Sequence, residues 1–271
     1  MRRLVFLGSA VVGGLALLQA SAAAAQQAAA PEDNMTLFGW AVAGRVQAQV
    51  APDYMGAKTY SVGPSGSLQF FRPGTEPVFS APDDSPSLQV LGDRTLSAGL
   101  VARYRSGRGD DDALRGFDKI DWAIEPGIYA EWWPMDGIRL HAEARRGVHG
   151  NEAWMGDLAA DAVHDDPRWL LSIGPRLHLA ESKFTETYFG VTPADAARSP
   201  FGISPYSADG TFTSGGALAS VEYRWTRRWS ILADADYERL FGKAGDSPIV
   251  ARLGSRDQIT AALGLRYAFG R

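Results

Sequence analysis

The stretch Ile259–Phe269, with the sequence ITAALGLRYAF, repeats with a period of two almost to the end of the chain. One face is apolar and ends in aromatic side chains, and it consists of Ile259, Ala261, Leu263, Leu265, Tyr267 and Phe269. The opposite face carries Thr260, Ala262, Gly264 and Arg266. This pattern predicts a strand with lipid on one side and a polar lumen on the other. An amphipathic strand of a soluble β-sandwich has the same period, so the rest of the chain has to decide between the two.

The N-terminus predicts export from the cytoplasm. Arg2 and Arg3 precede an apolar run, Leu4–Leu18, which is long enough for the core of a signal peptide and too short for a transmembrane helix. The small residues of Ala20–Ala25 follow. They predict a signal peptide over residues 1–25 and a flexible lead over residues 26–36. An exported chain of this composition is either a soluble periplasmic protein or a transmembrane barrel.

The composition narrows the function classes. The chain has no cysteine, so the sequence predicts neither a disulfide framework nor a lipoprotein signal. Its 27 basic residues stand against 31 acidic ones, and loss of Arg2 and Arg3 with the signal peptide makes the mature protein more acidic still. This charge argues against nucleic acid as a partner. The four histidines are scattered, so the sequence predicts no metal site and no cofactor.

The same alternation recurs along most of the mature sequence. In one segment Ile138 and Leu140 alternate with Arg139 and His141, so full charges occupy the polar positions. The core of a sandwich does not tolerate so many charges, whereas a wet lumen does. We therefore predict an all-β fold, a closed antiparallel transmembrane β-barrel over residues 37–269, with residues 270–271 as a C-terminal extension.

Twelve strands are expected, or ten if the short strands upstream of Gly92 form a single excursion. The upstream strands are the least regular and are placed at Leu37–Val50, Tyr60–Phe71, Thr75–Ser80 and Pro86–Leu91, and a later strand is placed at Ala153–Val163. Counted back from the last strand, long and short connections alternate, and barrels of this class have short periplasmic turns and long outer loops. The connections Glu181–Phe212 and Gly242–Arg256 are therefore expected outside the cell, and Thr226–Arg228 in the periplasm.

Several stretches resemble a known family, the MltA-interacting protein (MipA/OmpV) family of Gram-negative outer-membrane proteins. The connection Glu181–Phe212 resembles the family's loop signature, and the matching residues are Tyr188, Phe189, Gly190, Val191, Thr192, Pro193 and Ser199. Asp246, Ser247 and Pro248 resemble a second family signature. Residues Ala51–Gly56 resemble the family's first outer loop. The assembly signal of outer-membrane β-barrels is resembled by Gly264, Tyr267 and Phe269. Family members usually stop at that final aromatic residue, whereas this chain continues with Gly270 and Arg271.

The resemblance implies a function and partners that no spacing in the chain shows by itself. It implies a scaffold or adaptor in the Gram-negative outer membrane that links the envelope to a lytic transglycosylase and a peptidoglycan synthase. The surroundings would be outer-membrane lipid and lipopolysaccharide, and insertion would use the barrel-assembly machinery. Adhesion and stress-response roles are also associated with the family, and a narrow pore is the other interpretation of a barrel.

An outer-membrane lipid hydrolase is the competing class. One lumen face carries His141 and Glu143, and a second face carries Ser172, Arg176 and His178, so an acid–base set can be drawn from them. The simpler interpretation is a lumen filled by salt bridges, and no Gly-x-Ser-x-Gly nucleophile motif is present. We therefore predict that the chain is not an enzyme. The run Asp110–Asp112 lacks the alternating spacing of a calcium loop and predicts a solvated outer loop.

Overall fold

The computed structural model describes residues 41–71, 78–109 and 112–269. The predicted signal peptide, the lead, the start of the first strand and the C-terminal extension fall outside these ranges, as do Asp110 and Asp111. What the sequence predicts for those segments stays a prediction.

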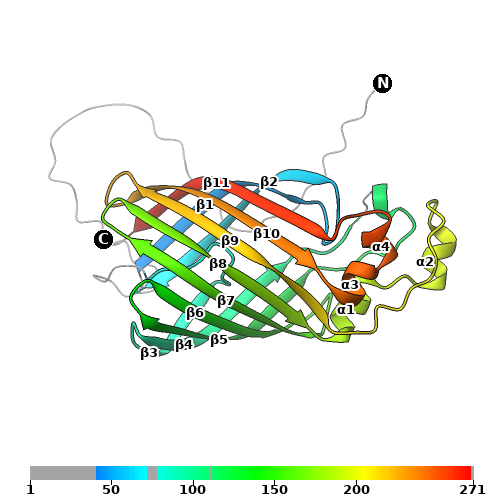
Figure 1. Ribbon diagram of the computed structural model, residues 1–271, viewed down its shortest axis with the longest axis horizontal. Helices are drawn as coiled ribbons and strands as arrows, with labels where there is room; N and C mark the ends of the chain where they lie inside the picture. Colours follow the sequence, from blue (N-terminus) through cyan, green and yellow to red (C-terminus); the bar gives the residue numbers. More distant parts are fainter. Residues whose placement is uncertain (1–40, 72–77, 110–111, 270–271) are drawn as a thin grey trace, which may run out of the picture. The chain divides into compact units, whose positions relative to one another are not determined.

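The described residues form one antiparallel sheet of eleven strands (Figure 1). The strands are β1 (Ala41–Pro52), β2 (Tyr60–Phe71), β3 (Ser87–Gly92), β4 (Leu96–Arg105), β5 (Ala123–Met135), β6 (Ile138–Arg146), β7 (Trp154–Asp165), β8 (Trp169–Ala180), β9 (Phe212–Arg224), β10 (Trp229–Leu240) and β11 (Asp257–Phe269). Their order is β2-β1-β11-β10-β9-β8-β7-β6-β5-β4-β3. The first and last strands therefore pair directly, with Val46 opposite Leu265.

The two edge strands of this sheet run in the same direction. Each of the ten neighbouring pairs is antiparallel, and an even number of reversals returns β3 to the direction of β2. Cα atoms of β2 and β3 approach within 8 Å, but no ladder joins them within the described ranges. The connection between two parallel strands has to return along the sheet before the second strand begins.

The predicted strand at Thr75–Ser80 is the one without a counterpart so far as the chain is described. Residues 78–80 are not in a strand, and residues 72–77 lie outside the described ranges. Bacterial barrels of this type have an even number of strands. Closure of the barrel and the count of twelve therefore stay predictions. The upstream strands β2 and β3 are confirmed, β2 at the predicted residues and β3 one residue later than predicted.

Alternation along the strands places polar side chains inside and apolar side chains outside, as predicted. On β6, Arg139, His141 and Glu143 are buried, whereas Leu140 between them is exposed. On β5, Ile128 exposes 60% of its surface, although a soluble protein usually buries this residue type. The distribution of polarity is thus the reverse of that in a soluble protein, and it suits a wall between lipid and a polar interior.

The two ends of the strands carry different connections. At one end the connections are short and span residues 93–95, 136–137, 166–168 and 225–228. At the other end the long connections carry η1 (Asp112–Leu114), α1 (Ser182–Phe189), α2 (Pro193–Arg198), α3 (Gly242–Asp246) and α4 (Pro248–Ala251), and the four α-helices gather there in Figure 1. The predicted alternation of connection lengths is confirmed, although these helices were not predicted. Within the described ranges no helix is long and apolar enough to span a membrane.

Candidate functional site

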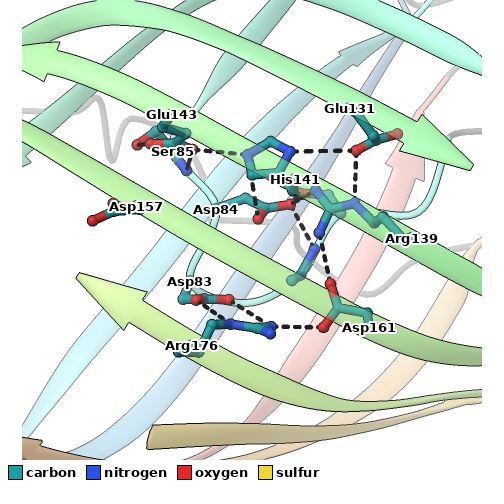
Figure 2. Close-up of polar contacts among 12 residues, drawn as sticks. Asp83, Asp84, Ser85, Glu131, Arg139, His141, Glu143, Asp157, Asp161 and Arg176 are labelled. Carbon is teal, nitrogen blue, oxygen red and sulfur yellow. Dashed lines mark hydrogen bonds and ion pairs between the residues drawn. The ribbon is translucent and has the colours of Figure 1, made fainter. Parts of the chain in front are cut away.

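The segment that leads from β2 into β3 lies against the polar face of the sheet. We call residues 78–86 the inner segment and Asp83–Ser85 its tip. The tip bonds to side chains that point inward from β4, β6 and β8 (Figure 2). Two aspartates thus meet a wall rich in arginine, and charge holds the inner segment in place.

Arg139 on β6 is the centre of this network. Its side chain is 1% exposed, and the guanidinium group bonds three carboxylates, at 2.6 Å to Asp84, 2.7 Å to Glu131 and 2.9 Å to Asp161. A guanidinium has a planar fork of donors, so one arginine joins two neighbouring strands to the tip. Removal of one partner from such a buried network leaves a charge uncompensated and costs about 3–5 kcal/mol.

Arg176 on β8 holds the other aspartate of the tip. Its Nε atom lies 2.7 Å from Asp83, and its Nη2 atom lies 2.8 Å from Asp161 on β7. Asp161 also pairs with Arg139, so the two anchors of the tip belong to one network (Figure 2).

His141 lies beside the tip among three carboxylates. Its Nε2 atom is 3.2 Å from Glu143 and 3.8 Å from Asp84, and its Nδ1 atom is 3.6 Å from Glu131. Ser85 also binds Glu143, because its backbone N–H and its hydroxyl donate to the two carboxylate oxygens at 2.9 and 2.6 Å. Titratable groups from β5, β6 and the tip therefore converge on one imidazole (Figure 2).

The structure brings some of the predicted polar residues together and separates others. His141 and Glu143 lie side by side, and Arg176 belongs to the same network. The buried hydroxyl of Ser172 has no hydrogen-bond partner, whereas the His178 side chain bonds Asp157 at 2.9 Å. No serine hydroxyl in the described part of the chain bonds a histidine. The predicted salt bridges among the charged side chains of the polar face are present.

Sequence reasoning missed the tip. Its two aspartates lie in a connection, where paired carboxylates usually indicate exposure to solvent. The available signal is weak and consists of Pro82 and Pro86, which bracket the tip and prevent it from continuing either strand.

The signature residues gather in a cap at the long-loop end. Phe189 is fully buried and Tyr188 nearly so, in an apolar cluster that includes Phe184, Phe212, Leu240 and Val250. The Ser247 hydroxyl donates to the Phe189 carbonyl at 2.6 Å and ties the second signature to the first. The first outer loop packs here too, because a Cβ added to Gly56, at a φ of +90°, would meet Val250 at 2.7 Å.

The rest of the signature shapes the loops around this cap. The Thr192 hydroxyl accepts from the Asp195 N–H at 3.0 Å, and the Asp195 carboxylate accepts from the Thr192 N–H, which forms a capping box at the start of α2. Burial alone would raise the pKa of Asp195, but hydrogen bonds from Thr192 and Arg198 outweigh it and hold that pKa below its ordinary value. Among the remaining signature residues, Gly190 ends α1 and Ser199 ends α2, whereas Pro193 and Pro248 begin α2 and α4. Val191 forms a β-bridge with Tyr206, and Asp246 forms an ion pair with Arg256.

The residues that resemble an assembly signal lie on β11. Tyr267 packs edge-on against Phe269, with ring centroids 4.5 Å apart, and lies 4.7 Å from the ring of Trp229. A Cβ added to Gly264 would lie 2.2 Å from the Val46 carbonyl oxygen, so glycine allows the close approach of β1. Aromatic side chains near the short-turn end suit the girdle of a membrane barrel.

The short-turn end is hollow, in contrast to the capped end. Two cavities, of about 420 and 380 Å³, flank residues 78–80. The first is lined by the turn at Asp166 and by Arg45 and Arg266, and the second by the turn at Asp93 and by His141. We call these two cavities the vestibule.

Comparison with known proteins gives a family and several similar structures. The profile of the family described as MltA-interacting protein MipA matches residues 46–269. Similar solved structures include an outer membrane channel from Pseudomonas putida F1, with 12% identity and a TM-score of 0.41, over 88% of this chain and 99% of that one. The CymD monoaromatic hydrocarbon channel is similar with 8% identity and a TM-score of 0.39, over 85% of this chain and 89% of that one. The outer membrane protease OmpT from Escherichia coli is similar with 9% identity and a TM-score of 0.32, over 88% of this chain and 100% of that one. No curated protein sequence matches the chain.

Proposed function

Since the chain belongs to the MltA-interacting protein MipA family, we propose that it is an outer-membrane β-barrel that serves as a scaffold for peptidoglycan-remodelling enzymes in the periplasm. The family name points to a lytic transglycosylase as the first partner to test. The contrast between the capped end and the hollow end of the sheet is the observation that carries the proposal.

The apolar outer face supports the membrane location. Large apolar side chains such as Ile128, Ile173 and Leu263 expose about 60% of their surface, and all three point away from the polar network. A soluble protein with such a face would aggregate, because exposed apolar patches are normally limited to a few hundred Å². Hydrocarbon solvates this face, so the outer membrane is the environment in which the sheet is stable.

The contents of the lumen favour a scaffold over a diffusion pore. The cap covers the long-loop end with fully buried side chains such as Phe189 and Val250. The tip adds an ion-paired obstruction beneath it, anchored by Arg139 and Arg176. A steady ion conductance of the unmodified protein in planar bilayers would favour the narrow-pore alternative.

The local chemistry gives no support to a hydrolase. The Ser85 hydroxyl donates to the Glu143 carboxylate and accepts from Arg103 and Arg145, so its partners include no imidazole to form the serine–histidine pair of a hydrolase. We therefore include in the proposal that the protein is not an enzyme. Lipid hydrolysis by the purified protein, abolished in Ser85→Ala, would contradict this.

The vestibule is the docking surface that the proposal requires. It opens among short turns, which face the periplasm in barrels of this class. Its walls offer Arg94, Asp93 and Gln89 as exposed polar groups to a periplasmic partner. A partner bound there would stay next to the peptidoglycan while the barrel holds it to the membrane.

Photo-crosslinking in native envelopes tests this assignment. A photoreactive amino acid is placed at Gln89 in the vestibule and, as the matched control, at exposed Arg252 at the long-loop end. We expect murein hydrolases or synthases among the products of the Gln89 variant only. Crosslinks to such enzymes from Arg252 alone, or from neither position, would contradict the periplasmic docking site.

A further inference from the structure

We propose that the tip and β6 together form a binding site for a divalent transition-metal ion, with Zn²⁺ as the best-fitting ion. Asp84, His141 and Glu143 each offer one ligand atom, and these atoms lie within 4.8 Å of one another. The site is separate from the scaffold role and does not depend on it. Sequence spacing hid it, because Asp84 lies far along the chain from the other two residues.

The distances suit a zinc ion. Zn²⁺ forms bonds of about 2.0–2.2 Å in a tetrahedron, which places neighbouring ligand atoms roughly 3.3–3.5 Å apart. The His141 Nε2 atom lies 3.2 Å from Glu143 Oε1 and 3.8 Å from Asp84 Oδ1. The Asp84 and Glu143 ligand atoms lie within 4.8 Å of each other, so one ion bound to all three residues would draw the two carboxylates together and leave a fourth position for water.

Each carboxylate divides its two oxygens between the surrounding cations and the site. Asp84 accepts from Arg139, Ser80 and the Ala81 N–H through Oδ2, which leaves Oδ1 facing the imidazole. Glu143 contacts Arg103 and Arg145 through Oε2, and its Oε1, which also accepts from the Ser85 N–H, faces the imidazole. The arginines therefore orient the ligands without occupying the oxygens that would bind the metal.

His141 is oriented as a metal ligand would be. The residue is 8% exposed, and its Nδ1 atom has no hydrogen-bond partner. That atom lies 3.6 Å from Glu131 Oε2, on the side of the ring away from the site. Metal-bound histidines usually donate their second N–H to a carboxylate, which fixes the tautomer and the orientation of the ring. A small rotation of the ring would complete this arrangement.

The charge of the network is compatible with a bound cation. The ion pairs around the site connect five arginines to seven carboxylates, which leaves an excess of two negative charges. The members are Arg103, Arg105, Arg139, Arg145 and Arg176 on one side, and Asp83, Asp84, Glu125, Glu131, Glu143, Asp157 and Asp161 on the other. One divalent cation would balance this excess. The alternative is that His141 and His178 both carry a proton.

The ligand types and the access route select the ion. Imidazole with carboxylates favours Zn²⁺ and its neighbours, whereas Ca²⁺ and Mg²⁺ prefer oxygen ligands alone. The vestibule cavity of about 380 Å³ is lined by Asp84 and His141 and extends to the turn at Asp93, so ions can enter from the short-turn end. A bound ion would fasten the inner segment to β6.

Metal binding to the full chain, folded in detergent and without a histidine tag, tests the proposal. We expect one equivalent of Zn²⁺ per chain in calorimetric titration and unchanged binding in excess Ca²⁺. His141→Gln and Glu143→Gln should bind at least about 100-fold more weakly, and Ser85→Ala, which removes a bond to a ligand, about tenfold. The matched control is His178→Gln, because His178 lies in the same lumen but bonds Asp157, and it should bind as the unmodified protein does.

Two outcomes would overturn the proposal. One is the absence of saturable Zn²⁺ binding by the unmodified protein. The other is an equal loss in His178→Gln and His141→Gln, which would show that the ion only neutralises the lumen. Heat-modifiable gel migration reports whether each variant folds. If His141→Gln does not fold, the visible absorption of Co²⁺ bound to the unmodified protein is measured instead. Strong absorption indicates a four-coordinate site with a nitrogen ligand and supports the proposal, whereas weak absorption indicates a six-coordinate oxygen site and contradicts it. The scaffold proposal is read by crosslinking and would survive either result.

Discussion

Neighbouring residues on one strand meet opposite environments. Leu263 is 62% exposed at the middle of β11, whereas Ala262 lies on the polar face of the sheet, opposite Asp234. We predict that Leu263→Arg lowers the free energy of unfolding by about 2–4 kcal/mol, because the guanidinium would enter hydrocarbon. Ala262→Arg, the matched control, can reach a carboxylate and should cost clearly less. Denaturant unfolding in lipid vesicles measures both, and equal losses would mean that the faces are assigned wrongly.

Asp195 gives α2 a sensitivity to acid. Its pKa is held low by hydrogen bonds that outweigh the effect of burial. A lowered folded-state pKa gives stability that is fully present above the unfolded value, about 3.9, and is lost as the pH falls through the folded value. We expect faster hydrogen exchange in residues 193–198 below about pH 4. Asp195→Asn keeps an acceptor but does not titrate, so an unchanged pH profile in this variant would contradict the assignment.

At the scale of elements, one side-chain bond joins the two connections that form the cap. Ser247→Ala would leave the Phe189 carbonyl without its donor and α4 without its N-cap oxygen, which accepts from Ile249. We expect a loss of about 1–3 kcal/mol in the stability of the cap, measured as the protease sensitivity of the long loops. Ser207→Ala, at an exposed position, is the control. Equal sensitivity in both variants would mean that the bond does not hold the cap.

Elements differ in how far the sequence predicts them. Strand β2 was predicted to the residue, although Pro64 and its glycines interrupt the alternation, because the turns that flank it are local signals. The helices of the cap were not predicted, because contacts with distant parts of the chain hold them in place. One example is the contact between Phe184 on α1 and Phe212 at the start of β9. The role of Asp84 was also hidden, since its partner Arg139 is reached across the lumen. His141 and Glu143 could be placed on one face from alternation alone, but not beside a third ligand.

The whole molecule combines a sheet with parallel edge strands and an inner segment that follows one of them. Ten antiparallel pairings place the end of β2 and the end of β3 toward the same side, so the chain has to travel back before β3 begins. The inner segment makes this return against the polar face rather than as a paired strand in residues 78–86. Within the described ranges, the segment that follows β2 therefore covers the polar face of the sheet instead of pairing with β2 or β3.

The difference between the two ends predicts a pattern of accessibility across the membrane. The chain has no cysteine, so an introduced one is the only thiol. With a membrane-impermeant thiol reagent on whole cells, we expect labelling of Asp246→Cys in the long connection and not of Arg94→Cys in the vestibule. Permeabilisation of the outer membrane should expose Arg94→Cys, while Ile128→Cys on the lipid face should stay protected throughout. The reverse pattern would place the vestibule at the cell surface and remove the periplasmic docking site. Labelling of both thiols from outside would show a lumen open from end to end, because the reagent would have to pass the cap and the tip to reach residue 94.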